Sequence, residues 1–381
     1  MTIKGWGLAI SLLGGQAMAL PLDIEEQRLN ALAQHQPELL NRYQPQLDHL
    51  LKRYRADPGE LTVTRKVAED ANALWRTAVE DVQSGVWDDR PLYWHRLALR
   101  RELKTAPAGF SIAPWQRQIL LSTVENASRG MSDIQFDEST EIRILLTGFD
   151  PFQLDQQLDQ SNPSGLAALA LDGKRWQVNG QWAQIESVLI PVRFQDFDDG
   201  LIESLLTPYL RDNSVDLILT VSMGRDQFDL ERFPGRNRSA SAPDNRNVHT
   251  GASKSTPLPP SLNGAELHGP EFVEFSLPAA QMQQATGPYA IRDNRTIRTL
   301  NGKREAQALH QLDGTVSVEG SGGGYLSNEI SYRSLLLKQL LGSPVPIGHI
   351  HTPKVNGFEP AHNRAIVEQL HAMIEHAALA L

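Results

Sequence analysis

Short, almost wholly apolar strand patterns alternate with helical patterns from Glu141 to the C-terminus, and this alternation limits the fold more than any other feature. The apolar runs begin at Ile142 (IRILL), Ser187 (SVLIPV) and Val215 (VDLILTV), and a segment with helical spacing follows the first two. Strands that are continuous apolar runs are typical of a parallel sheet covered by helices on both faces. The sequence therefore predicts a three-layer α/β/α domain with a largely parallel, mixed sheet.

Later strands and helices follow the same pattern, and irregular segments separate them. Residues 233–260 are rich in Pro, Ser, Asn and Arg and lack hydrophobic periodicity, which predicts an extended or mobile loop. The tract near 286–314 is expected to form a short hairpin insertion. The later predicted strands lie at 315–318 and 345–350, and the later helices at 331–341 and 361–379.

Residues 20–140 have a different pattern, which predicts an all-helical N-terminal region ahead of the α/β domain at 141–381. Apolar residues recur at helical spacing within 29–54 and 67–82, and prolines divide the region into about four or five helices. The region is expected to rest on the α/β domain or to extend it, and it offers a surface for a homo-oligomer contact or a protein partner. Five aromatic residues are expected to be core: Trp75, Trp87, Tyr93, Trp94 and Trp115.

The first 19 residues have the features of a secretory signal peptide. Lys4 supplies a positive charge, residues 5–15 form a short apolar stretch, and Ala17-Met18-Ala19 fits a small-x-small cleavage site. The stretch is short for a membrane span of ~20 apolar residues. We expect cleavage after Ala19, a periplasmic or secreted protein, and no stable membrane insertion after cleavage.

Composition narrows the classes of partner and cofactor. The chain has no cysteine, which excludes disulfides and thiolate metal sites, and its net charge of −9 argues against binding nucleic acid or an anionic membrane. His349 and His351 alternate on a predicted strand, but no acidic or histidine partner has clear metal-ligand spacing. We expect neither a metal nor another cofactor.

Polar segments follow the predicted strands, and ligands in open α/β sheets bind beyond the carboxyl ends of the strands. Fold logic therefore brings Glu231, Ser327 and His351 near one another. A serine, a histidine and a carboxylate can act as nucleophile, general base and orienting group. The four polar segments are 147–152, 222–231, 321–328 and 349–353.

Ser327 lies between Gly322-Gly323-Gly324 and an apparent helix start. Exposed backbone N–H groups and the positive end of a helix dipole would suit oxyanion stabilisation there. From residue type alone, however, a helix N-cap is the simpler interpretation of Ser327.

Three segments, LLTGFDPF (145–152), SGGGYLSN (321–328) and GHIHTP (348–353), resemble the signature segments of pyroglutamyl peptidase I. Weaker matches lie between them in the same order, and the resemblance runs from Ile142 to the C-terminus. That family removes an N-terminal pyroglutamyl residue using a Glu, a Cys and a His. The resemblance implies catalytic positions and walls of a pyroglutamyl-ring pocket: Glu231, Ser327 and His351 for the first, and Phe149, Phe152 and Tyr325 for the second.

The chain departs from the family pattern at three positions: Ser327 replaces the cysteine, Glu329 replaces a histidine, and Met223 stands where a glutamine is expected. The leading hypothesis is a hydrolase that removes a pyroglutamyl or similar acyl group from peptides or small acylated amines through Ser-His-Glu. An inactive relative that binds peptides or proteins is the alternative, and a serine esterase or amidase is a third. Loss of the thiol fits an oxidising compartment, where a reactive thiolate is vulnerable.

Overall fold

The computed structural model describes residues 20–56 and 59–381. The predicted signal peptide (1–19), with its cleavage site after Ala19, lies outside the described residues. Within the described residues, no helix combines the length and the apolar character that crossing a membrane requires.

The described part of the N-terminal region is all-helical, as predicted, although its helices are more numerous and shorter than expected. Pro37 begins a new helix, and Arg28 lies between two consecutive ones, so that one long amphipathic pattern is broken into short pieces. The helices are α1 (Ile24–Gln27), α2 (Leu29–His35), α3 (Pro37–Asn41), α4 (Gln44–Ala56), α5 (Glu60–Gln83), α6 (Arg90–Thr105) and α7 (Pro114–Ala127).

The α/β domain is built on a seven-stranded sheet of the described residues, in the order β2-β3-β1-β4-β12-β5-β8. The pairs β3–β1, β1–β4, β4–β12 and β5–β8 are parallel, while β2–β3 and β12–β5 are antiparallel. The predicted largely parallel, mixed sheet is therefore confirmed. The strands are β1 (Ile142–Phe149), β2 (Arg175–Val178), β3 (Gln181–Ile190), β4 (Leu217–Met223), β5 (Phe228–Glu231), β8 (Ile291–Asn294) and β12 (Ile347–Thr352).

Helices cover both faces of this sheet, which completes the three predicted layers. One face carries α8 (Pro163–Leu171) and α13 (Pro360–Ala378), which contact each other. The other carries α10 (Leu201–Asp212) and α12 (Leu326–Leu341), which also contact each other. Two short helices pack against these: α9 (Phe194–Asp198) contacts α10, and α11 (Ala279–Met282) contacts α13.

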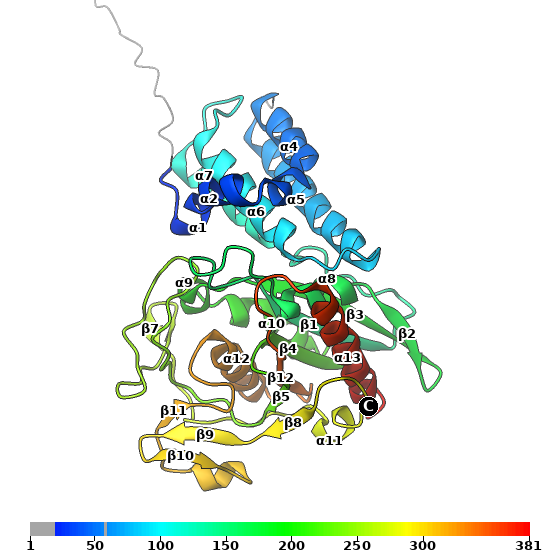
Figure 1. Cartoon of the computed structure of the whole chain (residues 1–381), viewed down its shortest axis with the longest axis vertical. Helices are drawn as coiled ribbons and strands as arrows, with labels where there is room; N and C mark the ends of the chain where they lie inside the picture. The colour runs from blue at the N-terminus through cyan, green and yellow to red at the C-terminus, as the bar shows by residue number, and fades with distance from the viewer. Residues whose placement is uncertain (1–19, 57–58) are drawn as a thin grey trace, which may run out of the picture.

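The helical region packs on the α8 side, and Figure 1 shows it as a separate layer at the end of the α/β domain near α8 and α9. Its apolar residues and those of the α8 and α13 face form one continuous core. Gly130, in the connection between the two parts, has a φ of +80°, and an added Cβ would lie 2.7 Å from the Trp75 ring. A side chain at this position would therefore push the two parts of the molecule apart.

The predicted strand at 315–318 does not join the central sheet. Its described counterpart, β11 (Ser317–Glu319), pairs with β9 (Thr296–Thr299), which also pairs with β10 (Gly302–Glu305) in a separate small sheet. The sequence pattern misled because a run this short has too few apolar residues to be buried on both faces. A further hairpin consists of β6 (Ser261–Leu262) and β7 (Ala265–Glu266).

Most of the predicted core aromatics are buried, but the prediction is wrong for Trp115. Trp75, Tyr93 and Trp94 are at most 1 % exposed, and Trp87 is partly buried against the core. Trp115 is 64 % exposed because it lies in the first turn of α7, on the side away from the buried positions of that helix.

The stability of the fold is expected to depend on pH through Asp89. This fully buried carboxyl accepts hydrogen bonds from Ser161 Oγ (2.6 Å) and the Asn162 N–H (2.9 Å), and burial, reinforced by the Asp88 charge, raises its pKa to about 7. Between the unfolded pKa of about 3.9 and this value, the folded state holds a proton that the unfolded state has lost. Stability should therefore fall as pH rises through this window.

The Asp89→Asn variant should remove this contribution. Urea unfolding measures the free energy of unfolding at about pH 5 and at about pH 8. The fall between these two values should be roughly 2–3 kcal/mol smaller in the variant than in the wild type. Asp137→Asn is the control, because the pKa of that exposed carboxyl is lowered and it stays ionised throughout this range. Equal pH slopes for Asp89→Asn and the wild type would contradict the assignment.

Candidate active site

Two neighbouring strands bring Glu231 and His351 into direct contact. Glu231 ends β5, His351 lies on β12, and the His351 Nδ1 is 2.6 Å from Glu231 Oε1. Glu231 is fully buried and His351 is 6 % exposed. Because a carboxylate oxygen can only accept, Nδ1 carries the proton, and Nε2 is left as an acceptor that can act as a base.

A third residue holds Glu231 from the opposite side. Asn294, at the end of β8, donates its Nδ2 hydrogens to Glu231 Oε2 (2.9 Å) and to the Ser321 carbonyl (2.9 Å). It therefore links the carboxylate to the loop that leads to Ser327. Sequence reasoning missed Asn294, because it lies within the tract interpreted as an insertion and has no motif of its own.

The other histidine of the HIH pair has a structural environment. His349 is fully buried, and its two ring nitrogens are each 2.8 Å from a hydroxyl, those of Thr220 and Ser222. Burial, and then the nearby His351, lowers its pKa well below the usual value, so it is neutral. Among the described residues, no group of three or more His, Cys, Asp or Glu side chains could hold a metal ion.

Ser327 lies in the first turn of α12, but it is not the N-cap, since that position belongs to Tyr325. Its hydroxyl donates a 3.3 Å hydrogen bond to the Gly322 carbonyl. Gly322 also borders the other two residues, because an added Cβ would lie 3.5 Å from His351 Cε1 and 3.6 Å from Glu231 Cγ. The three positions therefore meet around Gly322, with the Ser327 hydroxyl turned to that carbonyl.

A small pocket of about 40 Å³ opens beside Ser327. It has room for about three water molecules, which suits a small terminal group rather than a long side chain. The residues expected to form the ring pocket line it together with the serine. The lining residues are Phe149, Phe152, Asn162, Val192, Ser222, Met223, Tyr325, Leu326 and Ser327.

Ring contacts hold two of these walls in place. Phe149 stacks on Phe197, with ring centroids 6.4 Å apart, and Tyr325 meets Phe194 edge-on at 5.4 Å. The Tyr325 hydroxyl donates to the Pro243 carbonyl at 2.8 Å. The polar end of Tyr325 is thus bound to the 233–260 segment, and its ring is left to line the pocket.

The two residues after Ser327 hold the start of α12 in place. The Asn328 side chain accepts from the Gly235 N–H (3.0 Å) and donates to its carbonyl (2.7 Å). Glu329 is buried and accepts hydrogen bonds from both Arg238 and Arg333. Glu329 is therefore a buried ion-pair partner and is not among the residues that line the pocket.

Family models match the chain in two parts. The model described as "PA0049, C-terminal domain" matches residues 143–281 and 291–356, which is more than half of the chain. The chain belongs to the PA0049 family. The model described as "PA0049 N-terminal domain" matches residues 14–125. A relative named "Uncharacterized protein PA0049", from Pseudomonas aeruginosa, is 29 % identical over 406 residues, covering 81 % of this chain and 73 % of the relative.

Solved structures of pyrrolidone carboxyl peptidase from Pyrococcus furiosus are similar to part of the chain. One mutant is 21 % identical with a TM-score of 0.43, covering 63 % of this chain and 100 % of that one. A structure reported together with a cysteine-free mutant is 21 % identical with a TM-score of 0.42, covering 62 % of this chain and 98 % of that one.

Adjacent residues of α12 should respond differently to truncation. Asn328→Ala leaves a buried N–H and a buried carbonyl of Gly235 unpaired, so the unfolding free energy should fall by roughly 2–4 kcal/mol. Ser327→Ala removes one long hydrogen bond and should change it by less than about 0.5 kcal/mol. Urea unfolding of both variants tests this difference, and a large loss in Ser327→Ala would show that the serine is mainly structural.

Proposed function

We propose that the protein is a serine hydrolase that removes a pyroglutamyl or similarly small acyl group from the N-terminus of a peptide or from a small acylated amine. The observation that carries this proposal is the buried Glu231–His351 pair beside the same Gly322 that accepts the Ser327 hydrogen bond. The pocket beside Ser327 supplies a place for the acyl group.

In the proposed reaction, the Ser327 hydroxyl turns from the Gly322 carbonyl to His351 Nε2 and attacks the acyl carbonyl. His351 takes the hydroxyl proton, and the charge of Glu231 stabilises the imidazolium that forms. The amine leaves with that proton as the C–N bond breaks, and an acyl-serine remains. Water then attacks the ester, with His351 again as base, and releases the acid and the free hydroxyl.

The start of α12 is suited to stabilise the oxyanion. The first N–H groups of a helix have no acceptor within the helix, and the dipole places partial positive charge there. Serine needs this assistance more than cysteine does, because its hydroxyl is not ionised beforehand and must lose its proton during attack.

The pocket favours a small acyl group whose recognition differs from that of the resembling family. Phe149, Phe152 and Val192 form apolar walls that suit a flat ring. Met223 lines the pocket where the family has a glutamine, and its sulfur accepts from the Val355 N–H at 3.5 Å. A thioether has no hydrogen to donate and is only a weak acceptor, so it cannot bond a lactam as a glutamine would, which is why the proposal extends to similar acyl groups.

A catalytically silent, peptide-binding relative is the second candidate. The direction of the Ser327 hydroxyl favours it, since that hydroxyl is bonded to Gly322 rather than to His351. A serine esterase or amidase, the third candidate, would use the same residues on other substrates. We also propose export to the periplasm or the medium, with a mature N-terminus at Leu20, which intact-mass measurement from the native host tests.

Purified protein should cleave a pyroglutamyl-coumarin amide or a member of a panel of small esters and acyl amides. Ser327→Ala and His351→Ala should each abolish turnover, and the double variant should be hardly worse, because the residues act as a unit. Ser327→Cys should keep or raise activity, since a thiol beside His351 ionises more easily. An inert wild type with an active Ser327→Cys indicates a lost activity, and two inert proteins that still bind peptide favour the second candidate.

Asn294 should contribute to turnover without touching the substrate. Asn294→Ala removes the hydrogen bond to Glu231 Oε2, and hydrogen bonds to charged groups contribute about 1.5–3 kcal/mol, so kcat/KM should fall about 10- to 100-fold. The loss should lie in kcat rather than KM. Lys303→Ala, at an exposed position of β10, is the control that should match the wild type. Unchanged kcat in Asn294→Ala would refute the positioning role.

A further inference from the structure

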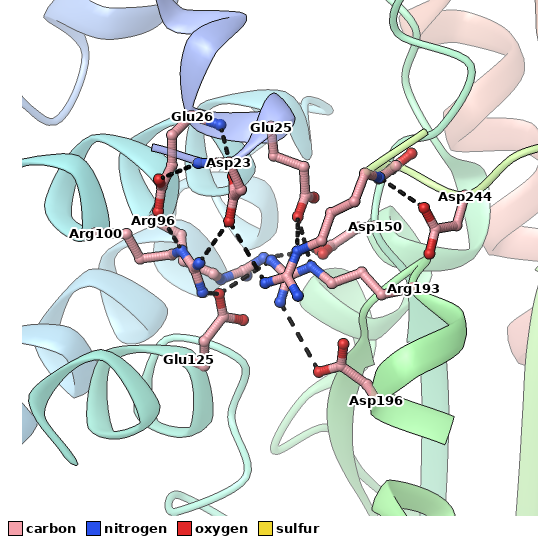
Figure 2. Close-up of polar contacts among 12 residues, drawn as sticks. Asp23, Glu25, Glu26, Arg96, Arg100, Glu125, Asp150, Arg193, Asp196 and Asp244 are labelled. Atoms are coloured by element: carbon pink, nitrogen blue, oxygen red, sulfur yellow. Dashed lines mark hydrogen bonds and ion pairs between the residues drawn. The ribbon is translucent and has the colours of Figure 1, made fainter. Parts of the chain in front are cut away.

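The helical region contacts charged residues that come directly after two pocket-lining residues in the sequence. Asp150 comes after Phe149 at the end of β1, and Arg193 comes after Val192 beyond β3. Figure 2 shows these two side chains turned into a cluster of carboxylates and guanidinium groups, most of which come from the helical region.

Asp150 is held between two arginines. Arg96, on α6, donates to Oδ1 at 2.8 Å, and Arg129, just beyond α7, donates to Oδ2 at 2.7 Å. All three side chains are at most 2 % exposed, and the Ser128 hydroxyl accepts from Arg96 Nε at 2.9 Å. Both carboxylate oxygens are thus bound from the helical side, which leaves the end of β1 little freedom to shift.

Arg193 is held in the same way by two carboxylates. Its Nε donates to Glu25 Oε2 at 2.5 Å and its Nη2 to Glu125 Oε1 at 3.0 Å. Glu125 also pairs with Arg100 and Arg129, so it connects both clamps. Burial alone would raise the pKa of Glu125, but its arginine partners hold that pKa well below the usual value. The Glu125 carboxylate therefore stays ionised.

A third contact follows the same plan. Asp89 accepts from Ser161 Oγ and from the N–H of Asn162, and Asn162 lines the pocket. Three separate segments of the pocket wall are therefore fixed by side chains of the helical region, from three different places along the chain.

We infer that the helical region is a functional part of the substrate site. It fixes the geometry of the acyl pocket and thereby determines which acyl group the pocket accepts. Asp150 and Arg193 are positioning residues of the α/β domain. The helical region supplies their partners: Arg96 and Arg129 for Asp150, and Glu25 and Glu125 for Arg193. The inference rests on the proposed function for its catalytic readout, but the geometry can be measured without it.

Asp150→Asn and Glu125→Gln keep side-chain size while removing one charge from each clamp. In each variant, kcat/KM for the acyl substrate should fall about tenfold or more, which corresponds to about 1.4 kcal/mol. Modification of Ser327 by a small organophosphorus fluoride should slow less than about threefold, because that reagent does not need the pocket walls. In this reaction the Oγ–P bond forms, the P–F bond breaks to release fluoride, and His351 takes the hydroxyl proton. A merely destabilised protein would lose both rates in parallel.

Hydrogen exchange supplies the readout that does not depend on turnover. Amides at 149–153 and 192–194 should exchange about tenfold faster in both variants, whereas those of β4 should not. Arg53→Met is the control, because it breaks ion pairs with Glu69 and Asp70 inside the helical region and far from the pocket segments in the chain. It should leave both rates and the exchange pattern unchanged.

The outcomes separate the two proposals. If the wild type reacts with neither the acyl substrate nor the fluoride, the proposed function fails, and the exchange pattern alone decides the inference. If the two rates fall together, or exchange at 149–153 and 192–194 is unchanged, the helical region is structural and the inference is overturned. If Asp150→Asn does not fold, Glu125→Gln and Arg129→Lys carry the same comparison.

Discussion

The buried ion-pair cluster between the helical region and the α/β domain is the constraint on which the rest of the structure depends. Removing a charge from water raises the free energy of the folded state. The attraction within a buried ion pair offsets this desolvation penalty only when the pair's geometry is good and its remaining polar atoms are hydrogen-bonded. Several ion pairs of the cluster join the two parts of the chain, as those of Asp150 with Arg96 and Arg129 do. The buried Asp150 and Arg193 of the α/β domain are both hydrogen-bonded by the helical region, so the two parts should fold as one cooperative unit.

Much of the fold can be predicted from the sequence because three strands of the α/β domain, β1, β3 and β4, lie where continuous apolar runs occur. Candidate site residues that lie in recognisable motifs could be named from the sequence alone. Two of them, Glu231 and His351, are in contact in the structure. The sequence pattern does not reveal β5 (FDLE) and β8 (IRDN), because each is four residues long and at least half of those residues are polar. Strands this short and polar leave little hydrophobic signal.

The contacts of the helical region could not have been predicted, for a different reason. Arg193 and Glu25 are separated by 168 residues, and Arg96 and Asp150 by 54. The sequence does not distinguish an arginine that will be buried from one on a solvated helix face, because neither occurs at a characteristic spacing from other residues. Asn294 shows the same limit at the site itself, where one amide joins two segments that only the fold brings together.

In the first turn of α12, three side chains are tied into the fold, whereas Ser327 is left at the pocket. Leu326 is in the core, Asn328 is bonded to Gly235, and Glu329 is bonded to two arginines, whereas the Ser327 side chain makes one long hydrogen bond at the pocket. The burial of Glu231 also supports the proposed hydrolase. A fully buried carboxylate reduces stability unless it is well paired, and replacing such groups by apolar ones is often stabilising. Under the proposed function, Glu231 orients the His351 ring next to the Ser327 position, and that role accounts for a carboxylate at a buried position. We therefore prefer the proposed hydrolase to the silent relative.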